Sequence, residues 1–189
     1  EHQDVRKIGC EHVGYDAAKK IRLSEVLESV GLNNKEINIA LATIISRLVQ
    51  PGSELSTHRY LKEQSALDEL LDTDFSNLPL KNLYKISDVL LKNKESIEKL
   101  VYQNEKDLFS LEEVITLYDI TNTYFEGRCL NNPKALYRRS KEKRTDSPLV
   151  ALGLVLDGSG FPKKSEIFPG NISEPKTIKQ MLDTLEAKN

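Results

Sequence analysis

The apolar residues of this 189-residue chain change their spacing near Leu111, and this change constrains the fold more than any other feature. Before that point, apolar residues recur every three or four positions, which is typical of amphipathic helices. After it, short runs rich in apolar and β-branched residues predict strands, and a final helical pattern follows them. The sequence therefore predicts an α+β fold in which a helical region precedes a β-β-β-α portion.

The helical region is expected to span residues 23–110, after a polar and weakly patterned segment at 1–22. Its most strongly marked helix follows Asn33 or Asn34, either of which can act as the N-cap, and stops before Pro51. A wide stripe of Ile, Leu and Ala runs along that helix, so we expect it to be buried on much of its surface.

Two further stretches of the helical region continue the same spacing. The leucines within 55–71 predict one helix that starts after Ser53. Helical spacing resumes over residues 80–108. That last stretch fits either one long helix or two helices broken near Asn93.

Residues 111–189 are expected to contain three strands and a helix. The second strand is an apolar run that ends at an Asp-Gly-Ser-Gly turn, and a Pro-Gly-Asn turn ends the third. A long polar stretch separates the first strand from the second. The expected elements are strands at 114–120, 149–156 and 161–168 and a helix that begins near Pro175.

The composition excludes several classes of function. Charged residues make up 30% and hydrophobic residues 39%, as in an ordinary globular protein, and the formal net charge of −2 gives no overall signal for nucleic-acid binding. No apolar stretch approaches the ~20 residues that span a bilayer. The two cysteines, Cys10 and Cys129, lie far apart. Neither a disulfide framework nor a cysteine-rich metal site is therefore expected, and a reducing cytoplasm fits best.

One acid is a candidate metal ligand. Asp119 follows the apolar run 114–118, and the chain turns polar at Thr121 and Asn122. We therefore expect Asp119 at the end of the first strand, where its hard oxygen atoms suit Mg²⁺. Enzymes that transfer phosphoryl groups on nucleic acids use two such cations ~4 Å apart. Taken alone, these residues favour a simpler role, in which Asp119 closes the strand or caps a turn.

A basic segment is the candidate DNA-binding site. Residues 131–144 contain six Lys or Arg and one Glu. Clustered cations bind DNA phosphates and release condensed counterions. The alternative, to which the sequence gives equal weight, is a solvated loop whose charges keep the protein soluble. The candidate DNA-binding residues are Arg138, Arg139, Lys141, Lys143 and Arg144.

Four segments resemble bacterial insertion-sequence transposases of the DDE class, in the branch related to insertion sequence type four. Three of them are YDITNTYFEG at 118–127, SKEKRTDSPLVALGLVLDGSGFP at 140–162 and FPGNISEPKTIKQML at 168–182. The fourth, ALATIISRLVQPGSELSTHRYL at 40–61, resembles the helical region that precedes the catalytic domain in that family. The order of acid-ending strand, basic loop, hairpin and helix is more specific than any single motif.

The resemblance implies that residues 111–189 are the start of an RNase H-like catalytic domain. Asp119 would be its first catalytic residue and a metal ligand, and Mg²⁺ or Mn²⁺ would be the cofactor of the intact protein. Water and then a 3′-hydroxyl would attack DNA phosphodiesters at the transposon ends. The second Asp and the Glu of the family would lie beyond residue 189, so we expect this chain to be a fragment that is inactive by itself.

The same resemblance implies DNA as the partner, self-association of the intact protein, no membrane contact and a location in the bacterial cytoplasm. The first residue is Glu1 and the one methionine is Met181, which also suggests a fragment. An alternative function is a helical DNA-binding or dimerisation module, for which the β portion is a non-catalytic scaffold. Residues 34–61 fit a helix-turn-helix, although this stretch is more apolar than basic.

Overall fold

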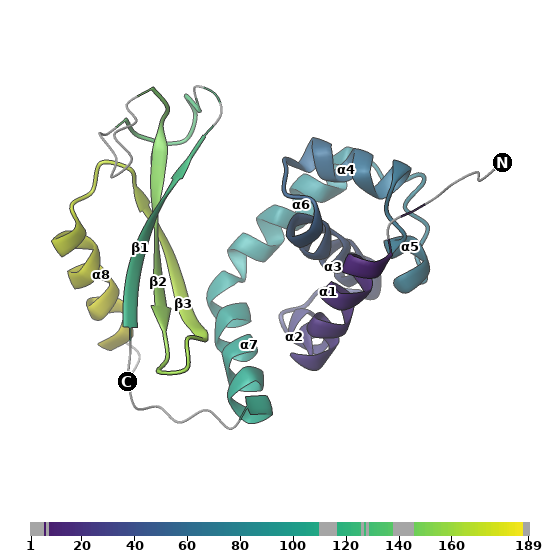
Figure 1. The fold of residues 1–189 in the computed structure, drawn as a ribbon, viewed down its shortest axis with the longest axis horizontal. Coiled ribbons are helices and arrows are strands. Elements are labelled where there is room, and N and C mark those ends of the chain that lie inside the picture. Colours follow the sequence, from purple (N-terminus) through teal and green to yellow (C-terminus); the bar gives the residue numbers. More distant parts are fainter. Residues whose placement is uncertain are drawn as a thin grey trace. The chain divides into compact units, whose positions relative to one another are not determined.

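The fold is α+β, which confirms the fold class expected from the sequence. The computed structural model describes residues 6, 8–109, 117–125, 127, 129–137 and 146–186. Within these residues the chain forms eight helices and one three-stranded antiparallel sheet (Figure 1). The chain divides into two compact units after Ser110, a helical unit and a unit that contains the sheet.

Seven helices make up the described part of the helical unit. Their bounds are α1 (Gly9–Lys20), α2 (Leu23–Ser29), α3 (Asn34–Val49), α4 (Glu54–Glu63), α5 (Leu67–Leu70), α6 (Leu80–Lys92) and α7 (Lys94–Phe109). None of the helices in the described part of the chain has the length and apolar character that crossing a membrane requires.

Helix α1 lies in the N-terminal segment for which the sequence showed no clear pattern. Its buried positions are Glu11 and Ala18, and Tyr15 packs at the edge of the core. A carboxylate and a small side chain leave no apolar stripe, so the hydrophobic spacing could not reveal this helix.

Capping residues fix the ends of α2, α3 and α4. Asn33 and Glu36 form a capping box at the start of α3, and the Ser53 hydroxyl accepts a hydrogen bond from the Ser56 N–H at the start of α4. Gly31 has a φ of 95° and ends α2, where the Leu32 N–H donates to the Leu27 carbonyl at 3.2 Å. The expected starts of α3 and α4 are therefore confirmed.

Two of the longer helical stretches are broken. The single helix expected after Ser53 is wrong, because α4 ends at Glu63 and the short α5 follows it. Between them, Ser65 and Ala66 turn toward Glu11 and bond its carboxylate. The stretch 80–108 forms two helices, α6 and α7, which meet at Asn93. Of the two alternatives that the sequence allowed, two helices broken near Asn93 is therefore confirmed. The Asn93 side-chain amide donates to the Val89 carbonyl at 3.0 Å.

Helix α3 carries much of the core of the helical unit. Its buried side chains include Ala40 and Ile45, both with no exposed surface, and they pack with residues of α2, α5 and α6. Gly14 of α1 lies against Ile45, and a Cβ at Gly14 would stand 3.1 Å from Ile45 Cγ2. The expected burial of α3 over much of its surface is confirmed.

The second unit contains a sheet in the order β1-β2-β3, with β2 in the centre. Both neighbouring pairs are antiparallel. Strand β2 has the bounds expected from the sequence, and β3 and α8 each begin within one residue of their expected starts. The elements are β1 (Leu117–Tyr124), β2 (Leu149–Leu156), β3 (Pro162–Pro169) and α8 (Glu174–Glu186).

Helix α8 packs on one face of the sheet, as Figure 1 shows. Met181 of α8 is buried with Ala151, Val155 and Phe168. The turn between β2 and β3 is closed by the Asp157 side chain, whose Oδ1 accepts hydrogen bonds of 2.9 Å from the backbone N–H groups of Ser159 and Phe161. This unit is thus a three-stranded antiparallel sheet covered on one face by a helix.

The expected position of Asp119 at the end of its strand is wrong. Strand β1 continues through Thr121 and Asn122 to Tyr124, so Asp119 is its third residue. Polar residues do not end this strand, because the exposed Asp119, Thr121 and Thr123 alternate with half-buried residues, as is common in antiparallel strands.

Candidate functional site

Asp119 lies on the face of the sheet opposite α8. Its neighbours Tyr118 and Ile120 pack toward the cluster that contains Met181 of α8. Successive side chains of a strand point to opposite faces, so Asp119 points to the other side. Its side chain is exposed there, as are those of Thr121 and Thr123.

The Asp119 carboxylate lies among uncharged neighbours. Across the sheet, Asp119 pairs with Leu154 of β2, and Leu154 pairs with Ser165 of β3. Within the described residues, no hydrogen bond or ion pair involves the Asp119 side chain. Both carboxylate oxygens are therefore available to a ligand from solvent.

The donor chemistry of Asp119 fits a hard divalent cation, but one carboxylate does not complete a site. Mg²⁺ binds oxygen ligands and is held through one or two carboxylates together with substrate phosphates. In the part of the chain that the structure describes, no three His, Cys, Asp or Glu side chains gather as a metal site. Asp119 can thus supply one ligand of a bound cation. Further acids and a phosphate must supply the other ligands.

The five candidate DNA-binding residues lie outside the described residues, so their role stays a prediction. They are Arg138, Arg139, Lys141, Lys143 and Arg144.

The segment 129–137, which leads into these basic residues, is attached to one end of the sheet. Leu136 exchanges two backbone hydrogen bonds of 3.0 Å with Leu149, the first residue of β2. The Lys134 carbonyl accepts from the Gly170 N–H at 3.0 Å, and the Lys134 ammonium donates to the Ile167 carbonyl at 2.6 Å. These bonds thus fix the segment 129–137 at this end of the sheet.

Gly170 makes this attachment possible. A Cβ at this position would stand 2.0 Å from the Leu149 carbonyl oxygen and 2.8 Å from that of Leu136. Backbone atoms cannot move aside as a flexible side chain does, so the close approach requires glycine. The sequence marked Gly170 as part of a turn but gave no signal of this contact.

Residues 34–61 form α3, a four-residue connection and the first part of α4, and whether this pair of helices reads DNA stays a prediction. Thr57, Tyr60 and Leu61 of α4 face the core. On its other side α4 exposes Arg59 and Lys62.

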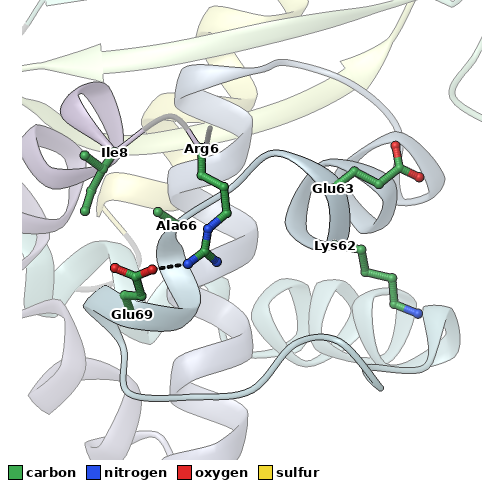
Figure 2. Close-up of a pocket in the computed structure, with 6 residues that line it drawn as sticks. All are labelled: Arg6, Ile8, Lys62, Glu63, Ala66 and Glu69. Carbon is green, nitrogen blue, oxygen red and sulfur yellow. Dashed lines mark hydrogen bonds and ion pairs between the residues drawn. The ribbon is translucent and has the colours of Figure 1, made fainter. Parts of the chain in front are cut away.

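One pocket of about 490 Å³ lies in the helical unit (Figure 2). Figure 2 shows Arg6 directed at Glu69, with which it forms an ion pair, and Arg6 also bonds Asp68 at 2.7 Å. Acidic and basic side chains alternate around this pocket, so it favours no single class of charged ligand. The residues that line it are Arg6, Ile8, Lys62, Glu63, Ala66 and Glu69.

Sequence reasoning identified Asp119 but missed the two residues that accompany it on the open face. Thr121 and Thr123 gave no separate signal in the sequence. Their exposure follows from the alternation of side chains along β1, which continues past the predicted end of the strand. Comparisons with models of protein families, with curated proteins and with solved structures find no match for this chain.

Proposed function

We propose that this chain is part of a DDE transposase and that Asp119 is the first catalytic carboxylate of its RNase H-like domain. The observation that carries the proposal is an exposed carboxylate, unpaired among the described residues, on the face of β1 opposite α8, in a β1-β2-β3-α8 unit. The order of the elements supports the proposal, with the acid on the first strand although not at its end.

The edge position of β1 supports a shared metal site. In the described part of the sheet, β1 pairs with β2 and has no strand on its other side. A strand that follows α8 in a longer protein would pair there, about 4.8 Å away. An acid on that strand would approach Asp119 closely enough to share a pair of cations ~4 Å apart. This is where we place the second Asp of the transposase.

In the proposed reaction, DNA phosphodiesters at the transposon ends are attacked first by water and then by a 3′-hydroxyl. Bound Mg²⁺ or Mn²⁺ would activate the nucleophile and neutralise charge on the phosphate. Asp119 would be one ligand of this metal. The residues in register with Asp119 are Leu154 of β2 and, one strand further, Ser165 of β3, so no charged side chain at these two positions competes for the cation.

The test is cleavage of DNA that carries the transposon ends, in Mg²⁺ or Mn²⁺, by the intact protein that the gene encodes. Asp119→Asn removes a charge at constant size and is expected to reduce cleavage to background. Glu166→Gln, on β3 of the same sheet, is the matched control and is expected to retain activity. Cleavage that survives Asp119→Asn would exclude Asp119 from catalysis. The 189-residue chain alone is expected to show no cleavage.

A second candidate is a helical DNA-binding or dimerisation module with a non-catalytic β scaffold. The exposed Arg59 and Lys62 on α4 favour it, because the second helix of a helix-turn-helix reads DNA. Titration of DNA separates the two candidates. Loss of binding on substitution of the five basic residues at 138–144 favours the catalytic domain, whereas unchanged binding there favours the helices.

A further inference from the structure

We propose that Asp119, Thr121 and Thr123 form a contact row for the sugar-phosphate backbone of DNA, in which the two threonines bind phosphate oxygens. The proposal rests on the proposed function, because it places the DNA relative to the catalytic carboxylate. It adds two substrate-binding residues that neither the sequence pattern nor the resemblance identified.

The row follows from the pleat of β1. All three side chains are exposed, and they alternate with the half-buried Tyr118, Ile120, Asn122 and Tyr124. Residues two apart in a strand lie on the same face, about 6.7 Å from each other. The row therefore extends for about 13 Å along the face of the sheet opposite α8, with Asp119 at one end.

The threonine hydroxyls are free to bind a ligand. Thr121 pairs with Leu152 and Thr123 pairs with Val150, and neither cross-strand side chain has a hydrogen-bonding group. No hydrogen bond of either threonine side chain occurs within the described residues. Threonine hydroxyls are common donors to DNA phosphates, and they carry no negative charge that would repel the backbone.

The row also leads toward the attached segment 129–137. Asp119 pairs with Leu154, whereas this segment bonds Leu149, five residues along β2. The separation along the strand is about 17 Å, or about five base pairs of DNA. Leu136 bonds Leu149 from the side of β2 that faces β3, so DNA would have to cross the end of the sheet as well as follow the row to reach this segment.

The simpler explanation is that threonine is common on exposed strand positions because it favours β structure. Valine separates the two explanations, because it keeps the branched shape and the strand preference and removes only the hydroxyl. Serine keeps the hydroxyl on a smaller side chain. Ser159→Ala removes an exposed hydroxyl from the turn at the other end of the same sheet and is the matched control.

The experiment measures binding of the 189-residue chain to a short mixed-sequence DNA duplex in Mg²⁺, by fluorescence anisotropy over a range of salt concentrations. Thr121→Val with Thr123→Val is expected to weaken binding about tenfold or more. The slope of log affinity against log salt should stay unchanged, because no charge is removed. Thr121→Ser with Thr123→Ser should bind within about twofold of the wild type, and Ser159→Ala should have no effect.

Two results would overturn the contact row. One is wild-type affinity in the double valine variant, and the other is no binding of the duplex by the wild-type chain. A lower affinity that the serine variant fails to restore would also count against hydroxyl contacts. The catalytic role of Asp119 is judged separately, since the cleavage assay with Asp119→Asn can succeed even when the valine variant binds normally.

Discussion

The Glu11 carboxylate accepts a 2.8 Å hydrogen bond from the Tyr60 hydroxyl, and this bond joins α1 to α4 inside the helical unit. The same oxygen accepts from the Ser65 hydroxyl at 2.6 Å, and the second oxygen accepts from the Ala66 N–H at 2.9 Å. Glu11 has no exposed surface. A buried carboxylate is tolerated when hydrogen bonds replace its hydration, and here three donors do so.

Glu11→Ala is expected to destabilise the helical unit by about 3–5 kcal/mol. The substitution leaves three buried donors without an acceptor and opens a cavity between α1 and the α4–α5 connection. Urea denaturation followed by circular dichroism measures the free energy of unfolding. Glu28→Ala, an exposed acid on α2, is the control and should change stability by less than about 0.5 kcal/mol. A loss of similar size in both variants would contradict the structural role of Glu11.

Stability should fall at high pH because of Tyr60. Burial raises the pKa of the Tyr60 hydroxyl well above its ordinary value of 10.0, and the hydrogen bond to Glu11 raises it further. The unfolded chain therefore loses this proton at a lower pH than the folded chain. The stabilisation is complete below pH 10.0 and is lost progressively above it, up to the folded-state pKa.

The test of this pH dependence compares wild type with Tyr60→Phe from neutral pH to above 10. The variant should be less stable at neutral pH, because Glu11 loses a donor. Its stability should then decline less steeply than that of the wild type as the pH rises. Parallel curves for the two proteins would show that Tyr60 ionisation does not contribute.

The helices that could be predicted from the sequence are those with strong local signals. Asn33 and Ser53 are good N-caps, and the apolar stripe of α3 follows the period of a buried helix. Helix α1 could not be predicted in this way, because Glu11 is bonded by residues 49 to 55 positions later in the chain. Hydrophobic spacing contains no information about a buried acid whose partners are so distant.

Gly170→Ala should strongly destabilise the sheet unit, by about 3 kcal/mol or more, because the new methyl group would meet the Leu149 carbonyl at 2.0 Å. Gly160→Ala is an informative comparison. Gly160 has a φ of 89° but nothing within 4 Å of its Cβ position, so only the conformational cost of about 1 kcal/mol applies. Thermal denaturation of the two variants measures the difference. Equal losses would indicate that the contact of Gly170 with Leu149 relaxes easily.

The sequence predicts which residue marks the candidate site, Asp119, but not where that residue lies in its strand. Asp119 stands out in the sequence because it follows an apolar run, yet the change to polar residues at Thr121 predicts a strand that ends too early. On an edge strand with one open face, a polar residue at every second position is compatible with continued pairing. The pairing of Thr121 with Leu152 depends on a contact 31 positions away, which local composition does not encode.

The last prediction concerns Tyr118, the residue before Asp119. A Cβ at Gly153 of β2 would stand 2.8 Å from the Tyr118 hydroxyl oxygen and 2.9 Å from Phe168 Cε2. Gly153→Ala should therefore cost about 1–3 kcal/mol through overpacking of the sheet against its aromatic neighbours. The Tyr118 hydroxyl is buried without a hydrogen-bond partner in the described part of the chain, so Tyr118→Phe alone should cost little or stabilise the fold.

Combining the two substitutions tests whether the hydroxyl itself causes the overpacking. Removing it from Tyr118 makes room for the alanine methyl group, so the double variant should be more stable than the sum of the single effects predicts. A coupling free energy of about 0.5–1.5 kcal/mol from chemical denaturation would support this contact. Strict additivity would place the strain of Gly153→Ala on Phe168 instead, which keeps its 2.9 Å contact in both backgrounds.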